Sequence, residues 1–516
     1  MQNFSVWAPN ASTVELVVDD ITHPMTPGEV WTSDVTPLPG MRYGFRVDGQ
    51  VVPDPRATSQ PDGVHGLSEV TDASFDWQHP WTGQQRSLIY ELHVGSFGGD
   101  FYGVIEKLPY LQELGVGAIE LMPVQPFAGT RNWGYDGVFW HAVHAHYGGP
   151  RGLKTLIDAA HGHGIAVYLD VVYNHFGPEG NYLNLFGPYT VASPTGWGDA
   201  VNMTNPHVRA YILDAVRRWF TEFRVDGLRL DATHAYTDES LLDDIAAIAR
   251  EVSADTGVKR TLIAEDLRDD PTITTSRGMD LQWNDSIHHS LHAIVSGERH
   301  AYYRDFGTIA HLVDAINHRY PSVVYTTTHD QVGNRPRGDR PSQNLSAAQQ
   351  LLKAAIIAAI PEPTMLFMGE EYGAQTPFPF FCSHSDAALV RGTINGRREQ
   401  FRRMGLDDSP LDPSLPETFD RARLDFVGDE DISAGYREIL ALGAHATAPI
   451  DAVGGPGWLA IQGALPLVAN LSERPVTVPY TGDVRYSPGT PVVGAHGITL
   501  EPWGFAFLNE MTRAAG

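Results

Sequence analysis

The stretch Gly227–His234, Gly-Leu-Arg-Leu-Asp-Ala-Thr-His, decides the fold that we predict for this chain. Residues 225–230 have the pattern of a short buried strand, but Arg229 is a charge that a strand facing only a packed core would not carry. Asp231 ends this strand, and an acid at the carboxyl end of a barrel strand is typical of catalysis. Arg229 and Asp231 leave the same face, so the arginine would hold the carboxylate ionised, which suits a nucleophile. A structural Arg–Asp pair would explain this one strand equally well.

Three further acids end predicted strands in the same way. The acids and the runs that they end are Asp170 after 165–169, Glu265 after 261–264, and Asp330 after 323–328. One βαβ step takes about 30 residues or more, which puts one step between Asp231 and Glu265 and two between Glu265 and Asp330. One step plus an insertion separates Asp170 from Asp231. The acids are therefore predicted on the third, fourth, fifth and seventh strands of one parallel barrel, where they converge on one mouth.

These four segments resemble the four short motifs of the α-amylase family, glycoside hydrolase family 13, and they occur in that family's order. The resemblance implies a (β/α)8 TIM barrel in which Asp231 is the nucleophile and Glu265 the general acid/base, while Asp330 holds sugar hydroxyls. It also implies contacts with the sugar at the cleavage point, and the residues are His175, Arg229, His329 and, from the segment 132–137, Tyr135. Two carboxylates in these roles give a retaining double displacement that needs no cofactor.

Composition limits the remaining classes of function. The chain has 516 residues, a formal net charge of −26 and a single cysteine, Cys382. Such an acidic balance argues against nucleic acid or an anionic membrane as partner and suits a neutral substrate. One cysteine excludes an intrachain disulfide, and neither a signal peptide nor an apolar run of about 20 residues is evident. We expect a cytoplasmic enzyme.

The pattern along the chain predicts three domains. Residues 1–85 have short strand patterns split by Pro and Gly and are expected to form a β-sandwich similar to the glucan-binding-like domain of family relatives. Residues 86–445 are expected to form the barrel, with an insertion at about 173–204 that resembles the family's extra domain after strand 3. Residues 446–516 are expected to form a C-terminal β-domain. Pro109 is expected to bend the helix that follows the first barrel strand.

Two groups of histidines could suggest a metal site. His141, His144 and His146 match no zinc spacing and have no cysteine or acid beside them. The second group is His288, His289 and His292, which follows the predicted sixth strand. The position of this group favours a contact with substrate over a metal, and the sequence predicts no metal and no cofactor.

Further segments, among them 79–83, 368–371 and 377–381, resemble the trehalose-releasing members of the family. This resemblance implies cleavage of the α-1,4 bond next to the terminal trehalose unit of malto-oligosyltrehalose, after another enzyme has formed that substrate. A glycogen branching enzyme is the alternative enzyme, and a non-catalytic glucan-binding scaffold is the alternative outside enzymes. Recognition of trehalose as leaving group requires further contacts, and the candidates are Thr233, His234, Asn284, Asp285, His288, Gln331, Arg335, Phe378, Phe380 and Phe381.

Overall fold

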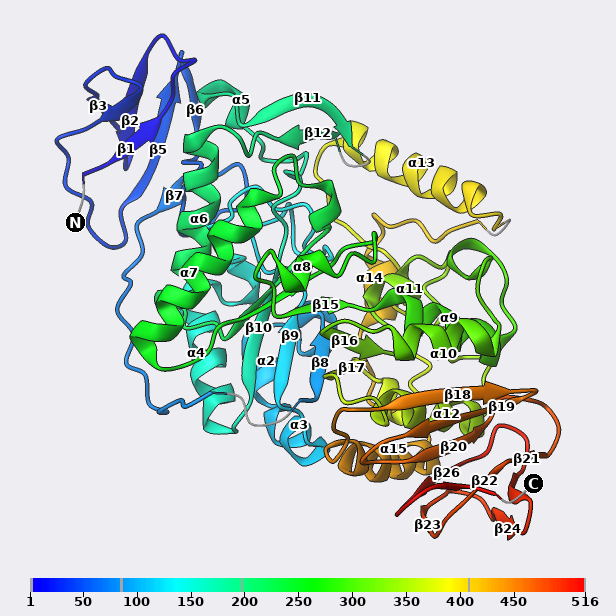
Figure 1. The fold of residues 1–516 in the computed structure, drawn as a ribbon. Coiled ribbons are helices and arrows are strands. Elements are labelled where there is room, and N and C mark those ends of the chain that lie inside the picture. Colours follow the sequence, from blue (N-terminus) through cyan, green and yellow to red (C-terminus); the bar gives the residue numbers. More distant parts are fainter. Residues whose placement is uncertain (1–2, 84–86, 196–197, 407–408, 515–516) are drawn as a thin grey trace.

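The computed structural model describes residues 3–83, 87–195, 198–406 and 409–514, and its centre is a closed barrel of eight parallel strands (Figure 1). In chain order the strands are β8 (Ile89–Leu92), β9 (Ala118–Leu121), β10 (Ala166–Val171), β13 (Gly227–Leu230), β14 (Thr261–Ala264), β15 (Leu281–Trp283), β16 (Ser322–Tyr325) and β17 (Thr364–Phe367). Each strand pairs in parallel with the next, and β17 closes the barrel onto β8. The predicted TIM barrel is confirmed.

The inside of the barrel is a packed core of its own. Seven of the eight strands contribute to one apolar cluster, which consists of Ile89, Ala118, Ala166, Tyr168, Ile263, Trp283, Val323, Tyr325 and Met365. Side chains from strands on opposite sides of the barrel can contact one another only inside the barrel. The eighth strand, β13, contributes Gly227, because a Cβ there would lie 2.7 Å from Cδ1 of Tyr168. The lumen below the site is therefore filled by side chains.

The helices outside the barrel belong to the connections between successive strands as far as residue 358, and the last three follow the final strand. They are α1 (Val94–Phe97), α2 (Phe101–Ile105), α3 (Leu108–Leu114), α4 (Gly149–Gly162), α6 (Pro206–Thr221), α7 (Ser240–Thr256), α8 (Thr272–Thr275), α9 (Asp285–Ser296), α10 (Ile309–Asn317), α11 (His329–Gly333), α12 (Ala347–Ala358), α13 (Ala387–Arg403), α14 (Pro416–Ala422) and α15 (Glu430–Gly443). The prediction that Pro109 bends one helix is wrong. Pro109 instead stands in the first turn of α3, where its missing N–H costs nothing, and α2 is a separate helix.

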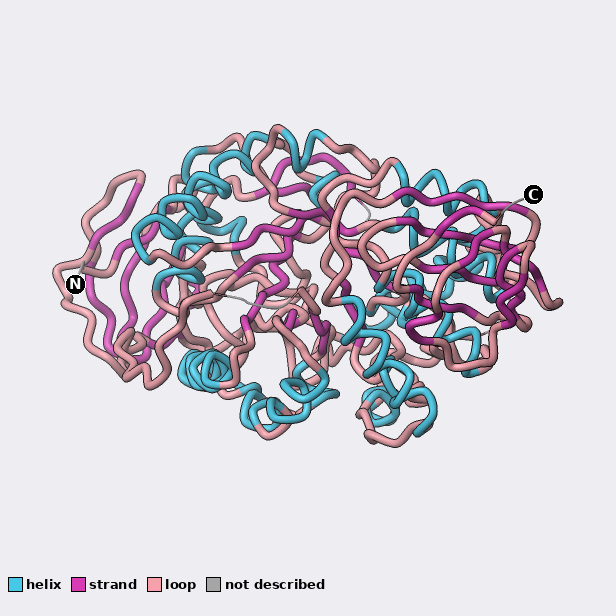
Figure 2. The backbone as a smooth tube through the Cα atoms, turned by 60° about the horizontal axis from the view of Figure 1, so that its bottom comes forward, coloured by secondary structure: helices cyan, strands magenta, loops and turns pink. Residues whose placement is uncertain are grey.

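The N-terminal strands form the predicted sandwich-like domain, at one end of the molecule (Figure 2). One sheet contains β3 (Ile21–Pro24), β2 (Val14–Val18), β5 (Arg42–Val47), β6 (Gln50–Val52) and β7 (Ser68–Glu69), and the other pairs β1 (Ser5–Trp7) with β4 (Val30–Thr32). Phe4, Trp7, Trp31, Tyr43 and Phe45 are buried in it, so these rings serve the core. The predicted boundary at residues 85 and 86 lies outside the described residues.

An insertion follows β10, as the spacing of the acids indicated. It contains α5 (Leu183–Phe186) and a hairpin of β11 (Thr190–Thr195) and β12 (Gly198–Val201). Its Tyr189 packs edge-on against Trp7, whose ring also stacks on His207 at 4.7 Å between centroids. The insertion therefore packs against the N-terminal sheets, and α6, which carries His207, begins after it with Asn205 as cap.

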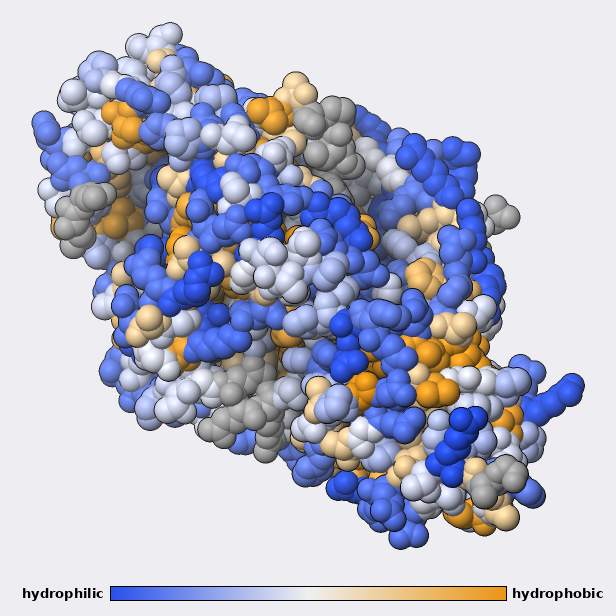
Figure 3. All heavy atoms as spheres, viewed as in Figure 1, coloured by the Kyte–Doolittle hydropathy of each residue, from blue (hydrophilic) through white to orange (hydrophobic). Residues whose placement is uncertain are grey.

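The C-terminal strands form three sheets at the opposite end of the molecule (Figure 2). The strands are β18 (Asp451–Gly455), β19 (Trp458–Gln462), β20 (Leu467–Asn470), β21 (Val476–Val478), β22 (Tyr480–Thr481), β23 (Val484–Tyr486), β24 (Val492–Gly494), β25 (Gly497–Leu500), β26 (Phe505–Leu508) and β27 (Thr512–Arg513). Hydrophobic side chains gather where α10 meets β18, around a groove lined by Ile309, Val313 and Gly454 (Figure 3). Within the described ranges, no helix combines the length and apolar character needed to cross a membrane.

Candidate active site

The alternation of strand residues carries charges to the mouth of the barrel. Ile89, Tyr168 and Ile263 point into the lumen, so the residues two positions later on the same strands must point inward one layer higher. Those residues are Glu91, Asp170 and Glu265. Glu91, Asp170 and Arg229 are almost completely buried, which makes this layer a charged floor beneath the opening.

Arg229 is the centre of this floor. Its Nη1 donates to Oδ2 of Asp170 at 2.8 Å and to Oδ1 of Asp231 at 2.7 Å, and its Nη2 donates to Oε2 of Glu265 at 2.8 Å. The guanidinium also lies over the ring of Trp283, 4.1 Å from the centroid. A fully buried arginine that binds three carboxylates fixes their relative positions. The structural alternative of a simple Arg–Asp pair does not describe this arrangement.

Glu265 is the carboxyl group of the site with the properties of an acid. Burial raises the pKa of Glu265 to about 8, with the Arg229 charge opposing and the Asp231 charge adding to the rise. Oε2 accepts both from Arg229 and from the backbone N–H of Ala232, at 2.9 Å. Ala232 has a left-handed φ of 43°, a strained conformation for a non-glycine residue, and this turn aims its N–H at the carboxyl group. The acidic proton is therefore left to Oε1.

Asp231 has a second partner that the sequence analysis did not name. Asn174 donates from Nδ2 to Oδ2 of Asp231 at 2.5 Å, so both carboxylate oxygens are held. His175 follows it and contacts the backbone oxygen of Tyr135 through Nε2 at 2.9 Å. Asn174 stands in the same motif, between Asp170 and His175, and this position was the available signal.

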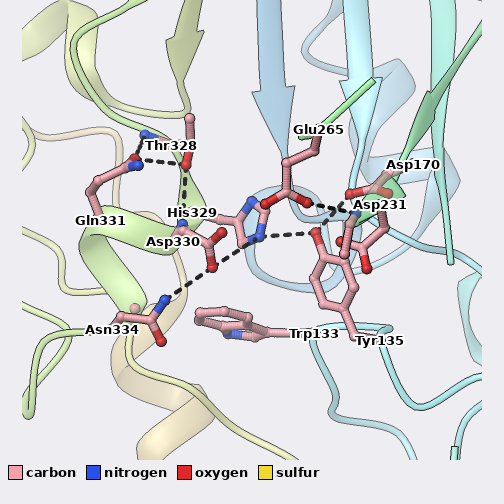
Figure 4. A network of polar contacts seen from close by, with 12 residues as sticks. Trp133, Tyr135, Asp170, Asp231, Glu265, Thr328, His329, Asp330, Gln331 and Asn334 are labelled. Carbon is pink, nitrogen blue, oxygen red and sulfur yellow. Dashed lines mark hydrogen bonds and ion pairs between the residues drawn. The ribbon is translucent and has the colours of Figure 1, made fainter. Parts of the chain in front are cut away.

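Asp330 reaches the site from a helix and not from the end of a strand. Strand β16 ends at Tyr325, and Thr328 begins α11 with a capping box in which Gln331 is the partner. The helix places His329 between Asp330 and Tyr135 (Figure 4). His329 Nε2 lies 2.9 Å from Oη of Tyr135 and 3.6 Å from Oδ1 of Asp330. The sequence prediction that Asp330 ends a strand is wrong, because the capping residues between strand and acid start a helix.

Tyr135 connects the two halves of the site. Its hydroxyl donates to Oδ2 of Asp170 at 2.7 Å, and its ring stacks on His329 at 5.3 Å between centroids. Trp133, from the same loop, meets His329 edge-on at 5.4 Å (Figure 4). A tyrosine ring at this point offers an apolar face to a sugar ring. Five of the seven residues that the family resemblance implied for the cleavage point, namely Asp231, Glu265, Tyr135, Arg229 and His329, thus lie in one network with Asp170; Asp330 and His175 adjoin it.

The predicted leaving-group residues that follow β13 and β15 take different places. Thr233 is buried, and its hydroxyl oxygen lies 2.9 Å from both Oδ2 of Asp266 and the backbone oxygen of Glu265. His234, next to it, is only half-buried. Asn284 caps α9 through Ile287 N, and Asp285 accepts from Oη of Tyr325 at 2.8 Å. The remaining candidate of this group, His288, is fully buried against Tyr303, with Nε2 3.2 Å from its hydroxyl.

The candidates from the later loops are also divided. Arg335 binds Glu298 through both terminal nitrogens, at 3.0 and 2.8 Å, and Asp339 through Nε at 2.8 Å. Phe378 and Phe381 are fully buried; Phe378 stacks on Trp133, and Phe381 meets His93 edge-on. Phe380 remains half-exposed, with its ring against Trp133 and Arg397. The sequence could not distinguish the buried rings from the exposed one, because an aromatic residue in a loop gives the same pattern whether its ring faces the core or the cleft.

The described residues contain no group of three or more His, Cys, Asp or Glu side chains arranged to hold a metal. His141 contacts the backbone oxygen of Tyr211 at 2.9 Å, and His144 stacks on Phe127 at 3.8 Å between centroids. Burial lowers the pKa of His144 to about 3, so this ring stays neutral. These histidines serve as packed core groups.

Comparison with known proteins agrees with this geometry. Residues 50–186 match the α-amylase catalytic domain, and residues 1–59 match carbohydrate-binding module 48, the isoamylase N-terminal domain. A crystal structure of a putative α-amylase from Salmonella typhimurium superposes with a TM-score of 0.92 at 33% identity, covering 99% of this chain and 97% of that one. The fold and the site thus define a glycoside hydrolase of the α-amylase class.

Relatives with more specific names show to which family within this class the chain belongs. A malto-oligosyltrehalose trehalohydrolase from Mycobacterium tuberculosis (strain H37Rv) is 40% identical over 98% of this chain and 99% of its own length. One from Saccharolobus solfataricus is 37% identical over 89% of each. A 1,4-α-glucan branching enzyme from Xanthomonas campestris is 28% identical over 72% of this chain and 60% of its own length. The chain belongs to the malto-oligosyltrehalose trehalohydrolase family.

Proposed function

We propose that this enzyme hydrolyses the α-1,4-glucosidic bond next to the terminal trehalose unit of malto-oligosyltrehalose and releases trehalose and a malto-oligosaccharide. The observation that carries the proposal is the binding of Asp231 and Glu265 by one guanidinium, in a chain that belongs to the trehalohydrolase family. Carboxyl groups that share a guanidinium are close together, and a separation of about 5–5.5 Å is that of a retaining glycosidase.

In the first step, a carboxylate oxygen of Asp231 attacks the anomeric carbon and forms a covalent bond to it. The bond from that carbon to the oxygen of the trehalose unit breaks, and Glu265 gives its proton from Oε1 to the leaving oxygen. The pKa of about 8 that burial gives to Glu265 keeps it protonated at neutral pH. The donors that hold Oε2, Arg229 and Ala232 N, orient Oε1 for this transfer.

In the second step, Glu265 acts as a base. Its carboxylate takes a proton from a water molecule, the water oxygen bonds to the anomeric carbon, and the bond to Asp231 breaks. Two inversions retain the α configuration. Asp330, His329 and His175 are proposed to hold hydroxyls of the sugar at the cleavage point, with Tyr135 under its ring.

Recognition of the trehalose unit is proposed for residues around the opening. His234, Asp285 and Phe380 keep part of their side chains accessible, so they are the candidates for direct contact. Thr233, Asn284, Gln331 and Arg335 would act by fixing the loops that carry such contacts, through the hydrogen bonds described above. The buried rings Phe378, Phe381 and His288 would support the same wall. We place the enzyme in the cytoplasm, acting on the product of a malto-oligosyltrehalose-forming enzyme.

The test is a comparison of two substrates. Malto-oligosyltrehalose and a maltodextrin of equal length are incubated with the enzyme, and the products are separated by chromatography. We expect trehalose as a product and a higher kcat/KM for malto-oligosyltrehalose, with no product from the Asp231→Asn variant. Equal rates on both substrates, or new α-1,6 branch points in amylose, would move the assignment to a branching enzyme.

A further inference from the structure

Glu91 has a buried side chain that contacts His329 at two points. It stands on β8, the first barrel strand, and only 1% of its surface is exposed. Its Oε1 lies 2.5 Å from Nδ1 of His329, and its Oε2 accepts the backbone N–H of the same residue at 3.0 Å. Glu91 thus fixes both the main chain and the ring of His329 at the first turn of α11.

The hydrogen bonds of His329 determine its protonation. The hydroxyl of Tyr135 has one hydrogen, and it goes to Asp170, which as a carboxylate can only accept. The phenolic oxygen must therefore accept from Nε2–H of His329. Glu91 can likewise only accept, so Nδ1 must also donate. An imidazole that donates from both nitrogens carries a proton on each and is positively charged.

We propose that Glu91 is a positioning residue that keeps His329 doubly protonated, and that this charged ring fixes Tyr135 and Asp330 against the sugar at the cleavage point. The inference rests on the proposed glycosidase function, because it assigns a role to a residue that supports the same site. Glu91 itself does not touch substrate; it acts through His329. A continuous series of hydrogen bonds runs from Glu91 through His329, Tyr135, Asp170 and Arg229. Arg229 in turn binds the nucleophile, Asp231.

The groups that face His329 agree with this charge. They come from four barrel strands (β8, β9, β10 and β13), the residue that follows β8, the loop after β9 and α11, and are Glu91, His93, Glu120, Tyr135, Asp170, Arg229 and Asp330. Burial lowers the pKa of His329, but the charges of Glu91 and Asp330 raise it to about 9, against the opposing charge of Arg229. The pKa of Glu265 is about 8. As pH rises, the enzyme therefore loses its acid before it loses the charge on His329.

The neighbouring strand supplies a matched control. Glu120 on β9 is the register partner of Glu91 and is equally buried, at 1%. Neither of its carboxyl oxygens has a hydrogen-bond partner among the described residues. Burial and the Glu91 charge raise the pKa of Glu120 well above its ordinary value, which favours its neutral form. Glu120→Gln therefore changes a carboxyl group in the same layer without removing a hydrogen bond to His329.

The experiment compares Glu91→Gln with Glu120→Gln. Glutamine keeps the shape of Glu91 but presents no negative charge, so the pKa of His329 should fall by roughly 1–3 units. We expect the basic limb of the kcat/KM profile for malto-oligosyltrehalose to move from near pH 8 toward acid in Glu91→Gln, by up to about two pH units, because His329 would then lose its charge before Glu265 loses its proton. The limb should stay in place in Glu120→Gln. The same shift in both variants, or no shift in Glu91→Gln, would overturn the proposal.

A second measurement is independent of activity. The ¹⁵N shifts of the His329 ring are followed against pH in the full-length enzyme, with the signal assigned by its loss in His329→Gln. We expect a titration near pH 9 in the wild type. A wild-type ring that titrates at or below pH 7 refutes the proposal even if Glu91→Gln does not fold. If the wild type releases no trehalose, the proposed function fails, while the titration still reports on Glu91 and His329.

Discussion

Replacing Glu265 by glutamine should separate the acid step from the nucleophilic step. With a pKa of about 8, about nine-tenths of Glu265 is protonated at pH 7 and about one-tenth at pH 9. For the wild type, kcat/KM on malto-oligosyltrehalose should therefore be level near pH 7 and fall roughly tenfold per pH unit well above pH 8. The sign follows from burial, which disfavours the ionised form that cannot donate a proton.

The Glu265→Gln variant should lose the proton donor, while its amide oxygen can still accept hydrogen bonds from Arg229 and from the backbone N–H of Ala232. With a sugar as leaving group, kcat/KM should drop by about 10²–10⁴-fold, and the basic limb near pH 8 should disappear. An activated aryl α-glycoside leaves without a proton, so its first step should be largely spared. Steady-state kinetics on both substrates from pH 5 to 10 measures this difference. Asp231→Asn is the matched control, because both substrates need the nucleophile.

Two results would refute this reasoning. Equal losses on both substrates in Glu265→Gln would mean that Glu265 does not protonate the leaving group. A basic limb that stays near pH 8 in the variant would mean that another group sets it. His329 would then be the first candidate, since its pKa of about 9 is the next to be reached.

Three further outcomes are expected. Asp231→Asn should fold normally, by circular dichroism, and lower kcat by several orders of magnitude, because no charge is left to form the covalent intermediate; near wild-type turnover would exclude it as nucleophile. Gly227→Ala should destabilise the enzyme by about 1–3 kcal/mol and lower Tm, because its Cβ would lie 2.7 Å from Cδ1 of Tyr168; an unchanged Tm would show that the lumen can adjust. Arg335→Ala should free Glu298 and reduce the preference for malto-oligosyltrehalose over maltodextrin, measured as the ratio of the two kcat/KM values; an unchanged ratio would remove Arg335 from recognition.

The sequence by itself determined the barrel and the floor of its site. Parallel strands point their carboxyl ends to one side, so acids that end strands at βαβ spacing must converge, whatever the loops between them do. Alternation along each strand then decided that Arg229 and Asp231 share a face. Both rules depend only on backbone geometry, which the order of residues fixes locally. The three-domain order followed in the same way from the change between strand patterns and helix patterns.

Only the tertiary structure decided which residues far apart in the chain meet. Arg335 and Phe381 have the chemistry of binding residues. In the folded protein, however, Arg335 binds Glu298, and the ring of Phe381 is buried against His93. In the sequence, Glu91 resembles any other polar residue in a strand. Its role becomes visible only because folding brings it into contact with His329, which lies 238 positions later. A side chain's charge and exposure depend on its neighbours in space, because burial and nearby charges set its pKa and its hydrogen bonds. No local pattern carries that information.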